Sequence, residues 1–353
     1  MENQIVTQDL EYIFSKVKCE KFRNSTILIT GCAGFLGFYF MKFFDRFANK
    51  IGIKKIIGLD NFMLRKPRWV DDLSDKCEIL PFCIIKDNIA NIANAKNADF
   101  IIHAASIASP SFYRKFPLET IDANIWGLRN LLEFYKDKQI KGFLFFSSSE
   151  IYGDPLKVPT DEEYRGNVSC IGARACYDEA KRFGETLCYV FANKFSLPIT
   201  IARPFNNYGA GMNINDLRVP ADFARAILEN KDIEILSNGT PKRTFCYIAD
   251  AIVGYLKVLL YGRFEYFNIG IDKPEISINE LAEIYQKIGV ELFNYTGKVV
   301  FGTSNDKDYL THNPTRRCPD ITKARTLLDY NPQILVESGV HKFLSFLKCE
   351  GGQ

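Results

Sequence analysis

Two side chains with complementary chemistry stand four residues apart in RACYDEAKRFGE, residues 174–185. In a helix, Tyr177 and Lys181 would share one face and lie one turn apart. A neighbouring positive charge lowers the pKa of a phenol, so such a tyrosine can take a proton from an alcohol near neutral pH. The same spacing also arises by chance in a chain with 17 tyrosines. The pair therefore indicates acid–base chemistry only if the rest of the chain supplies a site.

A phosphate-binding turn is predicted near the start of the chain. The apolar, β-branched run TILIT is followed at once by GCAGFLG, in which Gly31, Gly34 and Gly37 recur every three residues. The segment after them has helical length. Glycines allow a tight turn, and the free N–H groups at a helix start bind a pyrophosphate. This pattern predicts a dinucleotide site.

An acidic residue indicates which dinucleotide is bound. Asp60 ends the next apolar run and can accept hydrogen bonds from both ribose hydroxyls of an adenosine, which favours NAD. The basic residues Arg65 and Lys66 follow closely and leave NADP as an alternative.

The elements that must position these groups follow an α/β pattern. Strands are predicted at 26–30, 54–60, 82–87, 99–106, 142–149 and 197–203, separated by helical patterns that include 117–137. Alternation of this kind predicts a Rossmann-type, doubly wound parallel sheet with helices on both faces. We expect residues 1–203 with 233–262 to form this domain, and 204–232 with 263–353 to form a smaller α/β substrate lobe.

A reacting centre is predicted at one edge of that sheet, because ligands gather at the carboxyl ends of parallel strands. SSSE, residues 147–150, follows one strand, and the helix of Tyr177 would begin over the same edge. Ser148 can exchange a hydrogen bond with a substrate hydroxyl, and Tyr177 can act as the base. Together with a bound NAD, these groups predict removal of a proton and a hydride from a sugar-type alcohol.

The order of the motifs resembles that of the extended short-chain dehydrogenases/reductases, the NAD-dependent epimerase/dehydratase family. SSSEIYGDP, GNVSCIGARACYDEAKR and RRCPDI are most similar to the UDP-glucuronate decarboxylases within it. The resemblance implies oxidation of the sugar at C4, loss of carbon dioxide from the resulting β-keto acid, and UDP-xylose or its 4-keto form as product. Dehydratases carry Asp-Glu after the catalytic hydroxyl, whereas this chain has Ser149 and Glu150. That difference argues against dehydration.

The resemblance, together with the glycine turn, implies three sets of site residues. The catalytic set is Ser148, Ser149, Glu150, Tyr177, Lys181 and Arg317, the last as a carboxylate-binding fork. The cofactor set is Gly31, Ala33, Gly34, Phe35, Leu36, Gly37, Asp60, Asn61, Asn88, Ile89, Ala104, Ala105, Tyr177, Lys181 and Arg203. The substrate set is Ser109, Tyr113, Asn206, Arg218, Arg243 and Arg317. The chain departs from the decarboxylase pattern with Ala173 for proline, Gly211 for arginine and Leu236 for an aromatic residue.

Composition narrows the partners. A net charge of +3 is too small to indicate binding to nucleic acid. The sequence contains no uninterrupted run of about 18 apolar residues, so we expect no membrane span. The 10 cysteines form no C-x-x-C pair and the 3 histidines stand apart, so we expect no metal site and a reducing, cytoplasmic setting. The resemblance implies a homodimer through the helices at 117–137 and 174–196. A 4-epimerase, a C4 dehydrogenase, a 4,6-dehydratase on another nucleotide sugar, and a non-catalytic NAD-binding module remain as alternatives.

Overall fold

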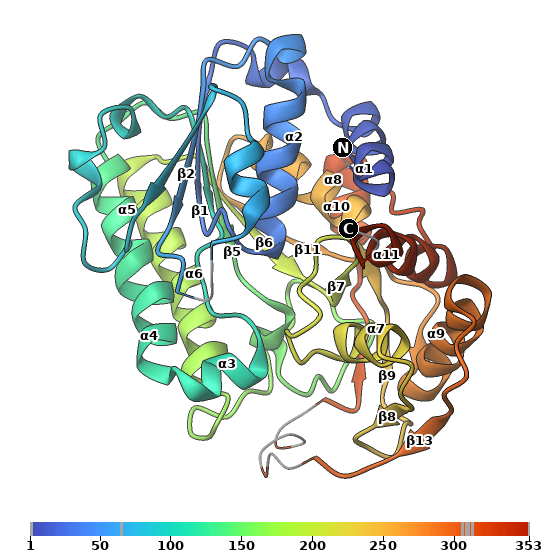
Figure 1. The fold of residues 1–353 in the computed structure, drawn as a ribbon. Coiled ribbons are helices and arrows are strands. Elements are labelled where there is room, and N and C mark those ends of the chain that lie inside the picture. Colours follow the sequence, from blue (N-terminus) through green and yellow to red (C-terminus); the bar gives the residue numbers. More distant parts are fainter. Residues whose placement is uncertain (1–2, 64–65, 305–306, 308–310, 312–313, 352–353) are drawn as a thin grey trace.

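A wholly parallel sheet of seven strands forms the centre of the molecule (Figure 1). The computed structural model describes residues 3–63, 66–304, 307, 311 and 314–351. The strand order is β11-β6-β5-β4-β1-β2-β3. The strands are β1 Thr26–Thr30, β2 Lys55–Asp60, β3 Cys77–Pro81, β4 Phe100–His103, β5 Gly142–Phe146, β6 Ile199–Pro204 and β11 Glu265–Ile269. The order reverses between β1 and β4, as in a doubly wound fold, so the predicted fold class is confirmed.

The central strands β1, β4 and β5 are buried on both faces, and their alternate residues enter two hydrophobic cores. Ile27 and Ile29 face one core together with helices α2 and α8, whereas Leu28 faces the other together with α5 and α6. This is the period of two that a pleated strand imposes. The helices are α1 Gln4–Lys16, α2 Phe35–Ile51, α3 Pro110–Lys115, α4 Pro117–Asp122, α5 Leu128–Tyr135, α6 Ala175–Phe195, α7 Val219–Leu228, α8 Ile248–Leu259, α9 Ile278–Phe293, α10 Thr322–Leu328 and α11 Val336–Gly351.

Helical segments cover the second face in the order that the sequence predicted. The predicted helix at 117–137 is α4, a π-helical turn at Ala123–Gly127, and α5. Helix α6 runs beside α4 in Figure 1 and carries the Tyr177–Lys181 pair. Within the described part of the chain, none of the helices combines the length and apolar character that crossing a membrane requires.

Short strands build the part of the molecule beyond the sheet. They are β7 Asn207–Tyr208 with β10 Cys246–Tyr247, β8 Ile233–Ile235 with β13 Val299–Phe301, and β9 Lys242–Arg243 between β12 Ile276–Ser277 and β14 Arg316–Arg317. Helices α7 and α9 pack beside them (Figure 1). Helices α1 and α11, near the two ends of the chain, lie side by side against this region.

Two predicted boundaries differ from the observed pairing. The strand predicted at 82–87 is a turn, and the edge strand is β3, at Cys77–Pro81. The apolar run misled the prediction because Phe82 and Ile84 enter the core from that turn rather than from a strand. The segment that returns to the sheet includes β11, beyond residue 262, whereas β8 pairs outside the main sheet. The division into two domains stays a prediction.

Candidate functional site

A cavity of about 2070 Å³ lies along the carboxyl ends of the central strands, and residues from the short-strand region also line it. The structure brings most of the predicted site residues to its wall. They are Gly31, Ala33, Gly34, Phe35, Leu36, Gly37, Asp60, Asn61, Ala104, Ala105, Ser109, Tyr113, Ser148, Ser149, Glu150, Tyr177, Lys181, Asn206, Arg218, Arg243 and Arg317. Three predicted residues are not among those that line it, namely Asn88, Ile89 and Arg203.

The glycine turn has the shape that a dinucleotide requires. Gly31 has a φ of +70°, and a Cβ there would lie 2.7 Å from the backbone of Ala104. A Cβ on Gly37 would lie 2.3 Å from the Gly31 carbonyl oxygen, so β1 and α2 could not pack this closely with a larger residue. Gly34 is the N-cap of α2 and offers no side-chain cap, which leaves the N–H groups of the first turn for a ligand. The turn therefore fits a pyrophosphate.

Asp60 stands at the end of β2, beside that turn. Its carboxylate accepts hydrogen bonds from the N–H groups of Ala33, at 3.0 Å, and Phe62, at 2.8 Å. Burial raises the pKa of Asp60 against the effect of these bonds. Of the basic residues that favoured NADP, Lys66 pairs with Asp71 at 2.6 Å, and Arg65 lies outside the described residues. The arrangement favours an adenosine with a free 2′-hydroxyl.

The predicted reacting groups meet at the start of α6. The Ser148 hydroxyl accepts a hydrogen bond from the Glu150 N–H at 3.2 Å and lies close enough to Tyr177 to lower the pKa of its phenol. The Tyr177 ring stacks on Tyr113 with centroids 5.0 Å apart. Lys181 Nζ donates to the Phe146 carbonyl at 2.7 Å and lies 5.6 Å from the centroid of the Tyr177 ring. The strand end of β5 and the first turn of α6 thus hold the serine, the tyrosine and the lysine together.

The electrostatic effect predicted for the tyrosine differs from the one observed. Burial raises the pKa of Tyr177 to about 12, and the nearby Ser148 hydroxyl has the largest effect in the opposite direction. Lys181 is itself fully enclosed, and burial lowers its pKa to about 7. A lysine that is largely neutral above that pH has little charge with which to acidify a phenol.

Glu150 lies between two arginines on the cavity wall. Arg317 grips it with a symmetrical fork, Nη1 to Oε1 and Nη2 to Oε2, each at 2.7 Å. Arg174 donates a further hydrogen bond from Nη2 to Oε2. Burial would raise the pKa of Glu150, but the charges of Arg317 and Arg174 outweigh it and lower the pKa to about 2. Glu150 is therefore a carboxylate at neutral pH.

Arg174 is a cavity residue that the sequence reasoning missed, and Asp178 lies beside it. Arg174 lines the cavity, and its Nε lies 3.6 Å from Asp178 Oδ2. Burial and the charge of Glu150 raise the pKa of Asp178 to about 7. A signal was present, because a residue three positions before Tyr177 shares its helical face.

The predicted substrate residues mostly bind other parts of the protein. Ser109 Oγ donates to the Asp216 carbonyl at 2.6 Å, and Arg218 Nε donates to the Asp216 carboxylate at 2.6 Å. Asn206 Nδ2 donates to the Thr244 carbonyl at 3.0 Å. Arg243 is buried. Its pKa falls to about 9, mainly because of desolvation and secondly because of the nearby charge of Arg317. These contacts fix the loops that form the far wall of the cavity.

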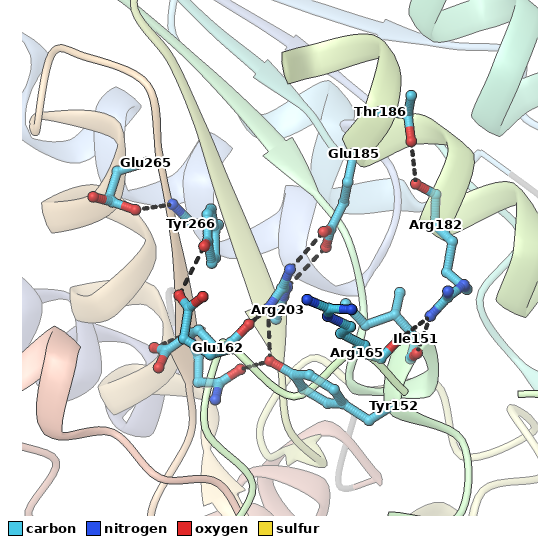
Figure 2. Close-up of polar contacts among 12 residues, drawn as sticks. Ile151, Tyr152, Glu162, Arg165, Arg182, Glu185, Thr186, Arg203, Glu265 and Tyr266 are labelled. Atoms are coloured by element: carbon cyan, nitrogen blue, oxygen red, sulfur yellow. Dashed lines mark hydrogen bonds and ion pairs between the residues drawn. The ribbon is translucent and has the colours of Figure 1, made fainter. Parts of the chain in front are cut away.

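Arg203 does not face the predicted cofactor site. Figure 2 shows it at the centre of a separate polar network. Its guanidinium donates from Nε and Nη2 to Glu185, at 2.9 and 2.6 Å, and from Nη1 to the Tyr152 hydroxyl and the Glu162 carbonyl, both at 2.8 Å. The side chain leaves β6 on the same face as Ile201, which is the face that α6 covers. Strand alternation thus carries it away from the cavity.

Asn88 and Ile89 lie away from the cavity wall because the third strand ends earlier in the sequence than predicted. Because β3 ends at Pro81, the residues that follow the strand end and line the cavity are 82–86. The Asn88 side chain instead accepts a hydrogen bond from the Ala90 N–H at 2.9 Å, and Ile89 is buried in the hydrophobic core.

Known proteins resemble this chain over most of its length. UDP-glucuronic acid decarboxylase 6 of Arabidopsis thaliana is 34% identical over 321 residues, which cover 90% of this chain and 87% of that protein. UDP-glucuronic acid decarboxylase 1 of Xenopus tropicalis is 31% identical over 353 residues, 97% and 78% of the two chains.

Solved structures share the fold. The UDP-glucuronic acid 4-epimerase of Bacillus cereus, determined with UDP-glucuronic acid and NAD, matches with a TM-score of 0.78 and 25% identity over 92% of this chain and 99% of that one. The UDP-glucose 4-epimerase of Thermotoga maritima, determined with UDP-glucose, matches with a TM-score of 0.80 at the same identity and coverage. Residues 27–270 match the model of the NAD dependent epimerase/dehydratase family. The resemblance expected from the motifs is thus confirmed, and the chain belongs to the NAD dependent epimerase/dehydratase family.

Proposed function

We propose that the protein decarboxylates a nucleotide-linked glucuronate, most simply UDP-glucuronate, to UDP-xylose or its 4-keto form. One observation carries the proposal. A guanidinium fork built for a carboxylate, that of Arg317, lies in the same cavity as the Ser148–Tyr177 pair. The names of the curated relatives that the chain resembles support the same activity.

The glycine turn and Asp60 hold NAD, which accepts a hydride from C4 of the sugar when bound. Tyr177 takes the proton of the C4 hydroxyl, and Ser148, which lies beside the phenol, orients that hydroxyl. Lys181, fixed on the Phe146 carbonyl, holds the nicotinamide end of the cofactor in place. Because the pKa of Tyr177 is about 12 in the free protein, the phenol must lose its own proton before it can take one from the substrate, so the bound cofactor and substrate have to lower this pKa.

Oxidation at C4 makes the glucuronate a β-keto acid. The C5–C6 bond breaks, its electron pair moves to the C4 carbonyl as an enolate, and carbon dioxide leaves. C5 then takes up a proton. If the hydride returned to C4 from the bound cofactor, Tyr177 would return its proton to the C4 oxygen and the pentose would form. Arg317 orients the carboxylate before it leaves. Glu150 serves as a charge or a base rather than as an acid, because its pKa lies at about 2.

Two alternatives within the family predict different products. A 4,6-dehydratase would release water, and the residue where that reaction uses an aspartic acid is Ser149 here. A 4-epimerase would release nothing, and two of the solved structures that resemble the chain are named 4-epimerases. Incubation of the protein with NAD and a panel of nucleotide sugars, followed by product masses, separates loss of carbon dioxide from loss of water and from no loss.

The substrate carboxylate is tested through Arg317. Arg317→Ala leaves the buried carboxylate of the substrate without its charge partner. We expect this loss to cost about 2–5 kcal/mol, or roughly 30-fold to several thousandfold in kcat/KM on UDP-glucuronate. Arg317→Lys recovers only part, since an ammonium lacks the planar fork. The matched control is Arg316→Gln, which changes the exposed neighbour that pairs with Glu275.

Two results would contradict the assignment. The first is a wild-type enzyme that releases no carbon dioxide from UDP-glucuronate. The second is an equal loss for Arg317→Ala on UDP-glucuronate and UDP-glucose, which would give Arg317 a role in the fold or in nucleotide binding instead.

We also propose a homodimer in a reducing compartment such as the cytoplasm. The 10 cysteines are free thiols, which a reducing setting preserves. Large apolar side chains stay exposed along α4, the π-helical turn that follows it and α6, namely Leu118, Trp126, Phe183, Tyr189 and Val190. A second copy is the simplest cover for such a face.

A further inference from the structure

Arg174 is a buried, charged residue on the cavity wall. It touches Glu150 through Nη2 and lies 3.6 Å from Asp178 through Nε. Its guanidinium also lies 6.0 Å from the centroid of the Tyr113 ring. A buried guanidinium is costly unless it is paired, so its position beside the reacting groups calls for a physical account.

The two arginines hold Glu150 in different ways. Arg317 binds both carboxylate oxygens, whereas Arg174 binds Oε2 alone. If Arg317 turned to another carboxylate, Oε2 would stay bound to Arg174 and Oε1 would become available to the cavity. Arg174 is therefore the contact that can persist while Arg317 changes partner.

The two arginines are also anchored differently. Arg174 is the N-cap of α6, and its carbonyl accepts hydrogen bonds from the N–H groups of Tyr177 and Asp178, both at 3.0 Å. It therefore moves with the phenol that takes the proton. Arg317 belongs to the two-residue strand β14, and its buried Nε has no hydrogen-bond partner among the described residues. Arg317 has a donor to spare for a ligand.

On the basis of the function proposed above, we propose that Arg174 is the positioning residue that keeps Glu150 oriented and ionised while the substrate carboxylate occupies the Arg317 fork. Two guanidiniums then face two carboxylates, one pair each. In the free protein both guanidiniums contact Glu150, so these three side chains carry one net positive charge, which favours an anionic sugar and which Asp178, 3.6 Å from Arg174, offsets only when it is ionised. No covalent bond changes in this exchange.

The exchange has a signature in the dependence on pH. The charged and titratable groups that face Glu150 from the described elements are Arg317 of β14, Arg174, Tyr177 and Asp178 of α6, Tyr113 of α3 and Arg243 of β9. Burial raises the pKa of Glu150, and the two arginines lower it. Once the substrate holds Arg317, Arg174 is the cation that stays hydrogen-bonded to Glu150 and opposes the effect of burial most directly. Without Arg174, Glu150 would take up a proton at a higher pH in the substrate complex than in the free enzyme.

The experiment compares Arg174→Gln and Arg174→Lys with the wild type and with Arg316→Gln. Carbon dioxide release from UDP-glucuronate with NAD is measured from acid to neutral pH. The profile of kcat reports the substrate complex, and that of kcat/KM reports the free enzyme. For Arg174→Gln we expect kcat near pH 7 to fall by about tenfold or more with KM changed far less, and the acid limb of kcat to move up by about one pH unit or more. The limb of kcat/KM moves less, because Arg317 still holds Glu150 in the free enzyme.

Two further variants assign the effect. Arg174→Lys keeps the charge, so it restores part of kcat and moves the acid limb back. The double variant Arg174→Gln with Asp178→Asn keeps the shifted limb, because Glu150 is the titrating group. Thermal unfolding of each variant checks that the fold is intact.

Three outcomes overturn the proposal. They are a kcat for Arg174→Gln within about twofold of the wild type, a fall in kcat with an unmoved acid limb, and a shift that disappears when Asp178 is also replaced. None of these three outcomes contradicts the proposed decarboxylase activity. A wild-type enzyme that releases no carbon dioxide from UDP-glucuronate overturns both proposals, so the two failures are distinct.

Discussion

Burial and the neighbouring carboxylates Glu150 and Asp178 oppose ionisation of Tyr177. The proposed role of its hydroxyl is tested by removing that hydroxyl. Tyr177→Phe keeps the ring, its stacking on Tyr113 and the shape of the NAD site, but it removes the hydroxyl that we propose takes the proton. We expect turnover to fall by at least about 10²-fold while NAD binding, measured by calorimetry, stays near that of the wild type. Tyr189→Phe, on the same helix but exposed, is the matched control.

The assignment of Tyr177 as the base depends on that contrast. A Tyr177→Phe enzyme within a few-fold of the wild-type rate would show that another group takes the proton. Loss of NAD binding in the same variant would instead show that the hydroxyl serves the cofactor site.

The sequence placed the reacting groups well where one strand end or one helix turn determines their position. Ser148 follows β5 directly, and Tyr177 and Lys181 share one face of α6, so their proximity follows from spacing alone. The ion pair between Glu150 and Arg317 could not be predicted in this way. It joins residues 167 positions apart in the chain, and the pairing of β14 with β9 brings the arginine to the site.

At the level of elements, a polar network fixes the loop that follows Ser148 against the sheet. The Tyr152 hydroxyl donates to Asn268 Oδ1 at 2.7 Å and accepts from Arg203 at 2.8 Å. Asn268 Nδ2 in turn donates to the carbonyls of Thr160 and Asp320, at 2.9 and 3.1 Å. Figure 2 shows the Arg203 side of this network, with Glu185 of α6 at its far end. The network thus ties the Ser148 loop, the α6 helix and the segment after Arg317 together.

Tyr152→Phe removes one atom from this junction. The ring still fills its buried position, but Asn268 Oδ1 loses its donor inside the protein. We expect the free energy of unfolding to fall by about 1–3 kcal/mol, the cost of a buried polar group left unpaired. Urea unfolding measures the difference. Tyr266→Phe removes a hydroxyl that binds Glu163 at the exposed edge of the network, and it should cost at most about 0.5 kcal/mol.

Equal effects for the two variants would show that the junction contributes no more than a surface hydrogen bond.

The same network shows where element prediction failed. Arg203 was expected at the cofactor because its strand ends beside the site, yet the alternation of side chains along β6 sends it toward α6. The misplaced third strand had a similar cause, because an apolar turn at the sheet edge has the composition of a strand.

At the scale of the whole molecule, we expect a homodimer that forms through the helical face of α4 and α6. Trp126 and Phe183 are 58% and 47% exposed, and they lie on segments that pack beside each other (Figure 1). This face is on the side of the sheet away from α2 and α8, so a second copy could dock there without covering those helices. A two-fold interface would bring each such helix against its own copy.

Phe183→Glu tests that interface, because it places a carboxylate where two copies would meet and each would bury an unpaired charge. We expect light scattering to give twice the mass of one chain for the wild type at micromolar concentration and the mass of one chain for Phe183→Glu. Val290→Glu is the control, since Val290 is equally exposed but lies on α9, away from this face. Turnover per chain should change little on dissociation, because every residue assigned to the reaction comes from one chain and lines one cavity. A wild-type protein with the mass of one chain, or a dimer that survives Phe183→Glu, would place the interface elsewhere.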